Sequence, residues 1–271
     1  MAVTNGWGQG AVNNTIDWGK GKTTATNDWG KVYDSSASGD TSLGTAAAFS
    51  NVYSVNFDGV DDYVDCGNVT SLNGLANGSI SMWFKTSNTA GQIFMAKWAS
   101  GQQQFYAILY PNTRIDVYGT SIGFRSTDSM ALADGNWHHL AITLEGGLTG
   151  NQRFKVYVDG TALTNLGFSG PTAFSTSTSD LLIGKRNAYS FSEWNGNLDE
   201  VAIFTKTLSP SEVTGLYNSG VPTNLTGEVG LANWWRMGDN DSGTGTTVTD
   251  QAGSNNGTLE NSPTFQENVP T

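Results

Sequence analysis

The sequence predicts an all-β protein, a β-sandwich or jelly roll with one short helix. Three observations support this fold class. Short runs of alternating apolar and polar residues recur roughly every ten to fifteen positions, which leaves little room for helices. Charged residues make up only 14% of the 271-residue chain, and its 34 glycines far outnumber its 6 prolines, as is typical of sheets joined by polar turns. A single stretch carries helix signals, and the chain is long enough for one large domain with additional segments.

The strands are predicted from this alternation. Residues 55–67, VNFDGVDDYVDCG, contain two extended runs around Asp-Gly and Asp-Asp steps, so we expect a β-hairpin with carboxylates at its bend. Further strands are predicted at residues 79–86, 92–98, 104–110, 114–118, 122–125, 136–144, 153–159, 180–185 and 197–204.

The one helix is predicted to begin at Ser209. The sequence Ser209-Pro210-Ser211-Glu212 combines an N-cap serine, a proline in the first turn and a glutamate three residues after the cap. This pattern is a capping box, in which the serine and glutamate side chains each satisfy a backbone N–H of the other residue. We expect Gly220 to end the segment.

An internal repeat occupies the N-terminal residues. Trp7, Trp18 and Trp29 lie eleven residues apart, and each is followed by glycine. The surrounding segment is too polar to bury a core of its own, and exposed indoles are unfavourable in water. We therefore predict that residues 1–45 form an extended arm whose tryptophans dock into grooves of a neighbouring subunit. A small, self-packed β-meander is the alternative.

Charge and composition exclude several classes of partner. The net charge of −11 opposes binding to the phosphate backbone of nucleic acids and to anionic membranes. No run approaches the roughly 20 apolar residues of a membrane span, and the first residues lack the features of a signal peptide. The single cysteine, Cys66, excludes an internal disulfide and is expected to be a small core residue. We expect the chain to be made and folded in a cytosol.

Seven motifs in order carry a resemblance to a known family: FDGVDDYV, SISMWFK, DGNWHHLAIT, FKVYVDGT, LLIGKR, GNLDEVAIF and LSPSEVTGLYNSG. They resemble the laminin-G-like, concanavalin A-like jelly roll, and we assign this domain to residues 46–222. The resemblance implies two curved antiparallel sheets of six or seven strands each. It also implies that residues 55–58 lie near residues 198–202, because the first and last strands of the family tend to pair.

The C-terminal residues 223–271 contain a displaced family segment. Residues 231–265 resemble the opening part of the same family, which usually precedes the FDG motif, yet here they follow the last strand. Either the C-terminal strands complete the same sandwich, as in a circular permutation, or they begin a truncated second copy. We expect the former because Trp234 and Trp235 need burial. The segment at 234–239 would then flank the strand at residue 55.

The N-terminal repeat carries a second resemblance. WGQGAVNNTI and WGKVYDSSASGDT resemble tandem segments at the N-termini of virion proteins from tailed bacteriophages. This implies a non-enzymatic virion structural protein assembled in the host cytoplasm, as a capsid decoration, head fibre or tail fibre subunit. Its residues 1–45 would contact other virion proteins, and homo-oligomers are common among such subunits. The alternatives are an adhesin that binds host glycans and, less favoured, a polysaccharide depolymerase.

Aspartates provide a candidate cation site. The carboxylates at residues 58–65 form either a solvated turn or a site for Ca²⁺, which prefers several oxygen ligands. In related concanavalin-like folds an aspartate at the start of the final strand helps to hold a structural cation. The resemblance assigns this role to Asp199, with Asp58 as its nearest partner, whereas Asp61 and Asp62 are expected to be turn residues. The alternative is that Asp199 caps a turn.

Three aromatic residues are candidates for sugar binding: Trp98, Tyr189 and Trp194 lie in predicted loops or at strand ends. Catalysis has less support. The adjacent His138 and His139 should point to opposite faces of a strand, and the chain has no other histidine. Some hydrolases of this fold carry an E-x-D-x-x-E strand, but the spacing in residues 193–200 differs, so no enzyme is predicted.

Overall fold

A computed structural model describes residues 24–27, 31–34, 49–110, 114–119, 122–125, 130–149, 152–164, 173–187 and 192–271. The chain divides into two compact units, residues 1–48 and residues 49–271. In the first unit, β1 (Thr24–Asn27) and β2 (Lys31–Asp34) form an antiparallel pair. Trp7, Trp18 and Trp29 lie outside the described residues, so the docking arm stays a prediction.

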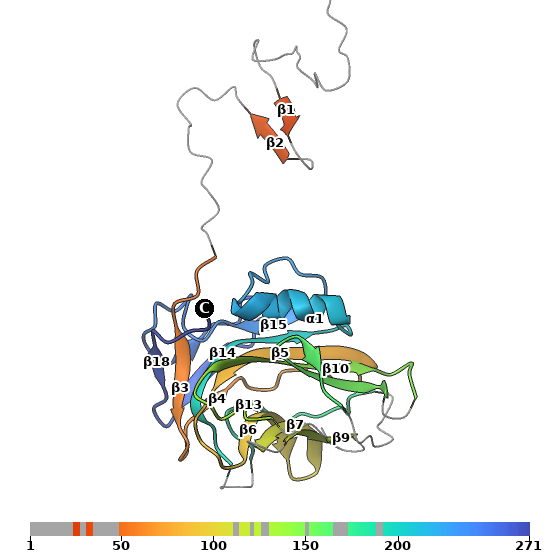
Figure 1. Ribbon diagram of the computed structural model, residues 1–271, viewed down its shortest axis with the longest axis vertical. Coiled ribbons are helices and arrows are strands. Elements are labelled where there is room, and N and C mark those ends of the chain that lie inside the picture. Colours follow the sequence, from red (N-terminus) through yellow and green to blue (C-terminus); the bar gives the residue numbers. More distant parts are fainter. Residues whose placement is uncertain are drawn as a thin grey trace, which may run out of the picture. The chain divides into compact units, whose positions relative to one another are not determined.

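Residues 49–271 form a sandwich of two antiparallel sheets, each with eight strands (Figure 1). The predicted all-β fold with one short helix is confirmed. The first sheet contains β3 (Ser54–Asp58), β5 (Asn77–Lys85), β10 (Trp137–Glu145), β11 (Phe154–Val158), β12 (Thr161–Ala162), β14 (Asn195–Phe204), β15 (Leu231–Trp235) and β18 (Thr264–Gln266). The second contains β4 (Tyr63–Asp65), β6 (Gln92–Ala99), β7 (Gln102–Tyr110), β8 (Arg114–Gly119), β9 (Ile122–Arg125), β13 (Leu181–Ile183), β16 (Thr247–Val248) and β17 (Gly257–Glu260).

The central strands of the first sheet are buried on both faces. In β5, Ile80, Met82 and Phe84 occupy alternate positions and enter the core between the sheets, whereas Ser81 and Trp83 face the other side. The opposite face of this sheet is covered by α1 (Pro210–Tyr217), which Figure 1 shows lying over β5 and β14. A second apolar cluster lies beneath this helix and the residues that follow it: Ala141, Tyr157, Ala202, Phe204, Leu208, Val213, Leu225 and Trp234.

The helix begins where the sequence predicts. Ser209 is the N-cap, its side chain accepts the backbone N–H of Glu212, and Glu212 returns a bond to the backbone of Ser209. Such a cap contributes about 1 kcal/mol. The helix ends at Tyr217, and its C-cap Asn218 adopts a left-handed conformation with φ of 42°. A short 3₁₀ turn, η2 (Asn218–Gly220), follows it.

The predicted hairpin at residues 55–67 is wrong. Strand β3 belongs to the first sheet and β4 to the second, so the acidic turn between them crosses from one sheet to the other. Phe57 and Val64 both lie in the core, each from its own sheet. Period-two alternation marks the buried face of a strand but does not identify its partner strand.

The neighbours of β3 were predicted in part. One neighbour is β14, with Val55 opposite Leu198 and Asp58 opposite Asn195, as the family resemblance implies. The other neighbour is β18, through Phe265 opposite Val55. The expected neighbour at residues 234–239 is wrong, because β15 pairs with β14 instead.

The C-terminal strands belong to the same two sheets. Strands β15 and β18 lie in the first sheet, whereas β16 and β17 lie in the second. They add two strands to each sheet, which explains why each has eight strands rather than six or seven. Trp235 is fully buried in the core, and Trp234 packs against the outer face of the first sheet.

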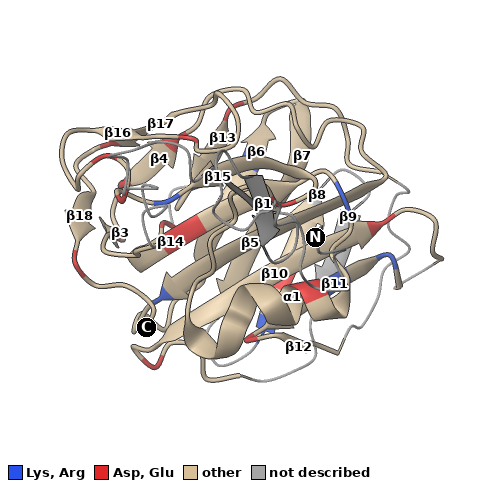
Figure 2. Cartoon of the chain, turned by 90° about the horizontal axis from the view of Figure 1, so that it is seen from above, with Lys and Arg blue, Asp and Glu red and all other residues tan. Residues whose placement is uncertain are grey.

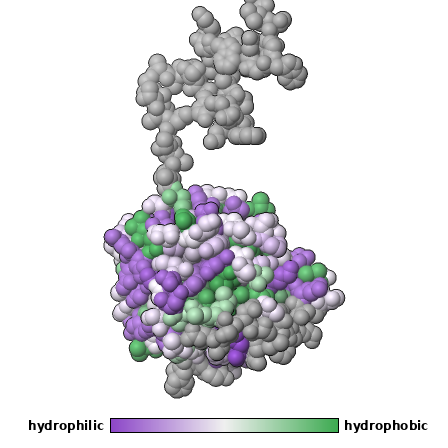
Figure 3. All heavy atoms as spheres, viewed as in Figure 1, coloured by the Kyte–Doolittle hydropathy of each residue, from purple (hydrophilic) through white to green (hydrophobic). Residues whose placement is uncertain are grey.

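The described surface is mainly polar. Acidic residues outnumber basic ones in the chain by 24 to 13, and Figure 2 shows both kinds at dispersed positions on the sandwich. In the view of Figure 3, hydrophilic residues surround small hydrophobic areas. Within the described ranges, the exposed large apolar residues are four valines, Val52, Val60, Val221 and Val229. None of the described helices has the length and apolar character needed to span a membrane.

Candidate functional site

Aromatic side chains gather on the outer face of the second sheet. Phe105, Ala107 and Leu109 of β7 point into the core, so the alternating positions Tyr106 and Tyr110 point outward. Tyr106 lies opposite Tyr118 of β8, and Trp98 of β6 joins the same cluster. We call Trp98, Tyr106, Tyr110 and Tyr118 the aromatic cluster.

The rings of this cluster contact one another and a guanidinium group. The centroids of Trp98 and Tyr106 are 5.1 Å apart with an edge-to-face geometry, whereas Tyr106 and Tyr118 are stacked at 5.2 Å. The guanidinium carbon of Arg186 lies 4.1 Å from the ring centre of Tyr106 and 5.7 Å from that of Trp98. Burial raises the pKa of Tyr106 although Arg186 opposes this, so its hydroxyl is protonated at neutral pH.

A buried carboxylate holds part of the cluster in place. Asp116 of β8 is fully buried, and the hydroxyl of Tyr118 donates to its Oδ2 at 2.9 Å. Arg114 binds the same carboxylate through Nε at 2.9 Å, and its guanidinium lies 4.6 Å from the ring centre of Tyr110. The rings of Tyr110 and Tyr118 therefore contact the same ion pair, Arg114–Asp116, which limits their rotation.

An acidic pocket lies on the same face, toward β4 and β17. Its volume is about 460 Å³, and it is lined by carboxylates and small polar side chains: Asp65, Asp180, Glu260, Ser254, Asn255, Asn256 and Thr258. The amine of Lys97 lies nearby, where it donates to the side chain of Asn68 and the carbonyl of Ser179. Burial lowers the pKa of Lys97, partly offset by Asp180.

Strand register connects the pocket with the aromatic cluster. One row of cross-strand partners runs through Thr258, Asp65, Leu182, Ala96, Tyr106 and Tyr118. Neighbouring strands lie ~4.8 Å apart, so this row of six strands spans ~24 Å. The face offers flat apolar rings at one end and hydrogen-bond acceptors at the other, which suits an extended ligand rich in hydroxyl groups.

Of the predicted sugar-binding residues that the structure describes, Trp98 lies on this face, where it is half-buried. The prediction that Trp194 binds sugar is wrong. Its side chain has 0% exposure and packs in the core against Phe84 and Phe94, so no ligand can reach it. Its backbone N–H donates to the carbonyl of Gly184 at 2.8 Å. Tyr189 lies outside the described residues.

Sequence reasoning missed Tyr106, Tyr118 and Arg186. The alternation in residues 105–109 contained a usable signal, since an apolar inward set places Tyr106 on the opposite face. Arg186 lies in the loop after the short strand β13, and no local sequence pattern predicts that its side chain contacts the aromatic cluster.

The structure does not bring Asp58 and Asp199 together. Asp58 lies opposite Asn195, whereas Asp199 follows Leu198 at the other end of the pairing with β3. Asp58 instead lies near Asp61 and Asp62, with carboxylate oxygens within 4.8 Å of one another.

The carboxylates near Asp58 serve the turn between the sheets. Asp58 accepts the N–H of Val60 at 2.8 Å, and Asp62 accepts the N–H of Asp58 at 3.0 Å. Burial raises the pKa of Asp62, an effect that its bond to the Asp58 backbone opposes.

A β-bulge places Asp199 and Glu200 on the same side of β14. The register with β5 shifts between Asp199 and Ala202, and Glu200 has a φ of +49°. Leu198 and Val201, on either side of this pair, both enter the core. Both carboxylates are therefore buried on the outer side of the first sheet.

Asp199 and Glu200 form the centre of a buried acidic cluster. Asp199 is 0% exposed and accepts bonds from the Asn51 side chain at 2.9 Å and the Glu200 N–H at 2.8 Å. Burial and the charge of Glu200 raise the pKa of Asp199 well above its usual range. Burial raises the pKa of Glu200 to about 7, although Arg236 and Trp234 oppose this. Asp239 is a third carboxylate of this cluster, and its Oδ2 lies 2.6 Å from Nη2 of Arg236. The cluster therefore contains three acidic groups and one guanidinium.

The two histidines point to opposite faces of β10. His138 binds Asp159 at 2.8 Å and Asp134 at 3.2 Å; burial lowers its pKa, but these acidic partners outweigh burial and raise it. His139 bonds Ser81 at 2.8 Å on the outer face, and burial lowers its pKa to about 4. Ser81 and His139 are both buried, so this pair is not accessible to a substrate.

Comparison with known proteins supports the same architecture. Residues 58–214 match the concanavalin A-like lectin/glucanases superfamily. No curated protein matches this chain. A proposed carbohydrate-binding protein of Bacteroides ovatus is similar in structure, with a TM-score of 0.64, 17% identity, and coverage of 89% of this chain and 68% of that chain. A heptameric SAP-like pentraxin from Limulus polyphemus gives a TM-score of 0.52 and 14% identity, over 62% of this chain and 82% of that chain.

These two likenesses show a shared fold. The matched family region spans more than half of the sequence and includes the strands from β4 to β14 and most of α1. The chain therefore belongs to the concanavalin A-like lectin/glucanases superfamily.

Proposed function

We propose that this protein binds carbohydrate on the outer face of the second sheet. The observation that carries this proposal is the row of cross-strand partners that joins the acidic pocket to the aromatic cluster. Pyranose rings have apolar faces that stack on aromatic side chains, and their hydroxyl groups donate to carboxylate and amide oxygens. The lectin-like fold and the proposed activity of the Bacteroides ovatus protein support the same function.

A glycan array with the full chain tests this function. Trp98→Ala should weaken glycan binding about tenfold or more, because an aromatic contact and its buried area are lost. Val229→Ala, at an exposed site on another part of the sandwich, is the control and should leave binding unchanged. Binding that is unaffected by Trp98→Ala, or the absence of binding to any glycan, would argue against this face as the site.

The proposed biological setting is a virion of a tailed bacteriophage, assembled in the host cytoplasm. The tandem Trp-Gly segments support this proposal, with residues 1–45 as the attachment to other virion proteins and the sandwich displayed as a head or tail component, as a homo-oligomer. A glycan-binding face also suits the alternative role of a host-glycan adhesin. Particles made with a chain lacking residues 1–45 should not incorporate the protein, and unchanged incorporation would rule out the docking arm.

We propose that the protein is not an enzyme. Glu193 and Glu200, the glutamates nearest to a glycosidase pattern, are both buried, and Glu200 is paired with Arg236. A retaining glycosidase needs two accessible carboxyl groups about 5 Å apart across a sugar. Incubation with any polysaccharide that the protein binds should release no reducing ends, and turnover would support the depolymerase alternative.

A structural Ca²⁺, implied by the fold family, is proposed at Asp199. The residues fit a cation because three carboxylates face one guanidinium, so the buried cluster has excess negative charge when ionised. The Oδ1 atom of Asn51 is also buried without a hydrogen-bond partner among the described residues. Asp199 and the Asn51 amide oxygen would hold the ion, which would neutralise the buried carboxylates.

A further inference from the structure

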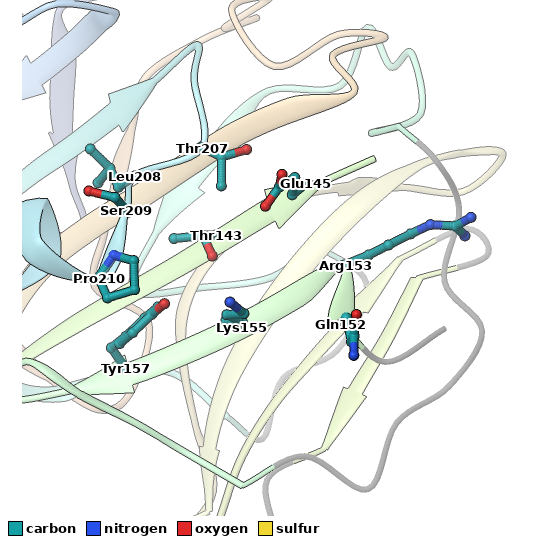
Figure 4. Close-up of a pocket in the computed structure, with 10 residues that line it drawn as sticks. All are labelled: Thr143, Glu145, Gln152, Arg153, Lys155, Tyr157, Thr207, Leu208, Ser209 and Pro210. Atoms are coloured by element: carbon teal, nitrogen blue, oxygen red, sulfur yellow. The ribbon is translucent and has the colours of Figure 1, made fainter. Parts of the chain in front are cut away.

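A second cavity, with a volume of about 290 Å³, lies on the outer face of the first sheet (Figure 4). Its floor comes from β10 and β11, where Thr143 lies opposite Lys155. The N–H of Glu145 bonds the carbonyl of Arg153 at 2.8 Å, so these two residues face each other beside that pair. Its wall is formed by residues 207–210, which lead into α1.

Two side chains that carry hydroxyl groups line this cavity. Thr143 and Tyr157 are each only 2% exposed. Neither hydroxyl oxygen is among the fully buried side-chain atoms that lack a partner in the described ranges, and both side chains line the cavity. Burial raises the pKa of Tyr157, so its hydroxyl remains a donor at neutral pH. Both hydroxyls can therefore form hydrogen bonds with a ligand in the cavity.

The charge at this cavity is opposite to that of the whole chain. Lys155 is exposed and forms no ion pair with a described residue. Arg153 lies at the same rim, where its Nε donates to the carbonyl of Leu148 at 2.5 Å. Glu145 supplies one negative charge against these two positive charges, in a chain with a net charge of −11. The local field therefore favours an anionic group.

The wall of the cavity is fixed by hydrogen bonds. The hydroxyl of Thr207 donates to the carbonyl of Leu144 at 2.5 Å, and the N–H of Leu208 donates to Ser79 at 2.9 Å. The capping box at Ser209 then locks the entry into α1. A ligand would therefore enter a preformed site and would not have to order this segment.

We propose that this cavity binds one sugar unit that bears a carboxylate, such as a uronic acid. Lys155 pairs with the carboxylate, and the hydroxyls of Thr143 and Tyr157 bond the hydroxyl groups of the ring. A cavity at the lower end of ligand-pocket volumes suits a single ring. The site lies on a different sheet from the aromatic cluster, so it is independent of the proposed glycan-binding face.

Calorimetric titration of the full chain with D-glucuronate and D-glucose tests the proposal, since these sugars differ only at C6. Glucuronate should bind at least about tenfold more tightly than glucose, because an ionic hydrogen bond is added. Lys155→Met should remove this preference. Lys185→Met is the matched control for loss of a lysine, and it should leave glucuronate binding unchanged.

Thr143→Val separates ligand binding from stability. Removal of a hydroxyl that faces the cavity should change the melting temperature little, while glucuronate affinity falls several-fold. Equal binding of glucose and glucuronate, or an unchanged affinity in Lys155→Met, would overturn the proposal. So would inorganic phosphate that binds as tightly as glucuronate, because the site would then recognise an anion only.

Discussion

The Nε atom of Arg236 lies 3.0 Å from Oε1 of Glu200, so a buried ion pair joins the bulge of β14 to the C-terminal segment. The other carboxylate oxygen, Oε2, accepts the indole N–H of Trp234 at 2.6 Å. Both carboxylate oxygens of Glu200 thus accept hydrogen bonds from residues that follow the matched family region. The C-terminal segment therefore supplies both side-chain partners of the Glu200 carboxylate, which is buried on the outer side of the first sheet.

Arg236→Met should destabilise the protein strongly. It leaves the carboxylate of Glu200 buried without its cation, and breaking a buried pair in this way costs about 3–5 kcal/mol. Chemical denaturation measures the change in the free energy of unfolding. The double variant with Glu200→Gln should recover part of the loss, since no buried charge remains. A loss below about 1 kcal/mol in Arg236→Met would show that Glu200 is not held ionised by this arginine.

Deletion of residues 231–271 should prevent folding of the sandwich. The truncation removes β15 to β18 and exposes the edges of β3, β4 and β14, which are open to aggregation. Circular dichroism and size-exclusion chromatography should show unfolded or aggregated protein. Deletion of residues 1–48 is the control, and its melting temperature should equal that of the full chain because both sheets are retained. A folded, monomeric C-terminal truncation would contradict this prediction.

Calcium should raise the melting temperature, and a chelator should reverse the increase. A ligand at 100 times its dissociation constant adds about 2.7 kcal/mol to stability. Asp199→Asn should abolish the response, while in chelator this variant should be at least as stable as the wild type because a neutral amide replaces a carboxyl group whose charge is disfavoured by burial. Asp58→Asn should keep the calcium response. Loss of the response in Asp58→Asn alone would place the ion at the turn between the sheets.

His139 should make the protein less stable in acid. Its pKa is about 4 in the folded chain and about 6.5 when unfolded, so the unfolded state binds more protons as the pH falls from 6.5 toward 4. The resulting loss is about 3 kcal/mol, from a pKa difference of about 2.5 at 1.36 kcal/mol per unit. Glu200 has the opposite dependence, because its raised pKa makes stability fall as the pH rises from 4.5 toward 7.

The His139 contribution is therefore measured as a difference. Denaturation of wild type and His139→Gln at several pH values isolates it, because Glu200 is common to both proteins. The variant should gain stability relative to wild type as the pH falls below 6.5. A stability difference that is constant between pH 4 and pH 7 would mean that His139 is not held neutral by burial.

Local patterns predicted much of the architecture. The strands at residues 79–86 and 104–110 follow from alternation, and the start of the helix follows from the capping box at Ser209 and Glu212. These features depend on residues a few positions apart. The candidate site was predicted only in part, since of the two aromatic candidates that the structure describes Trp98 lies on the proposed face and Trp194 lies in the core. Trp98 and Trp194 both lie near strand ends in sequence, and their exposure depends on what packs over them.

The sequence by itself determined which segments are strands, where the helix begins and which family the sandwich resembles, because each follows from short-range periodicity, capping or motif order. Only the tertiary structure decided that the acidic turn after Phe57 crosses between sheets, that β18 pairs with β3, and that Asp199 and Glu200 share one face. Alternation specifies two faces for each strand. Distant segments decide which strands pair and what covers the second face.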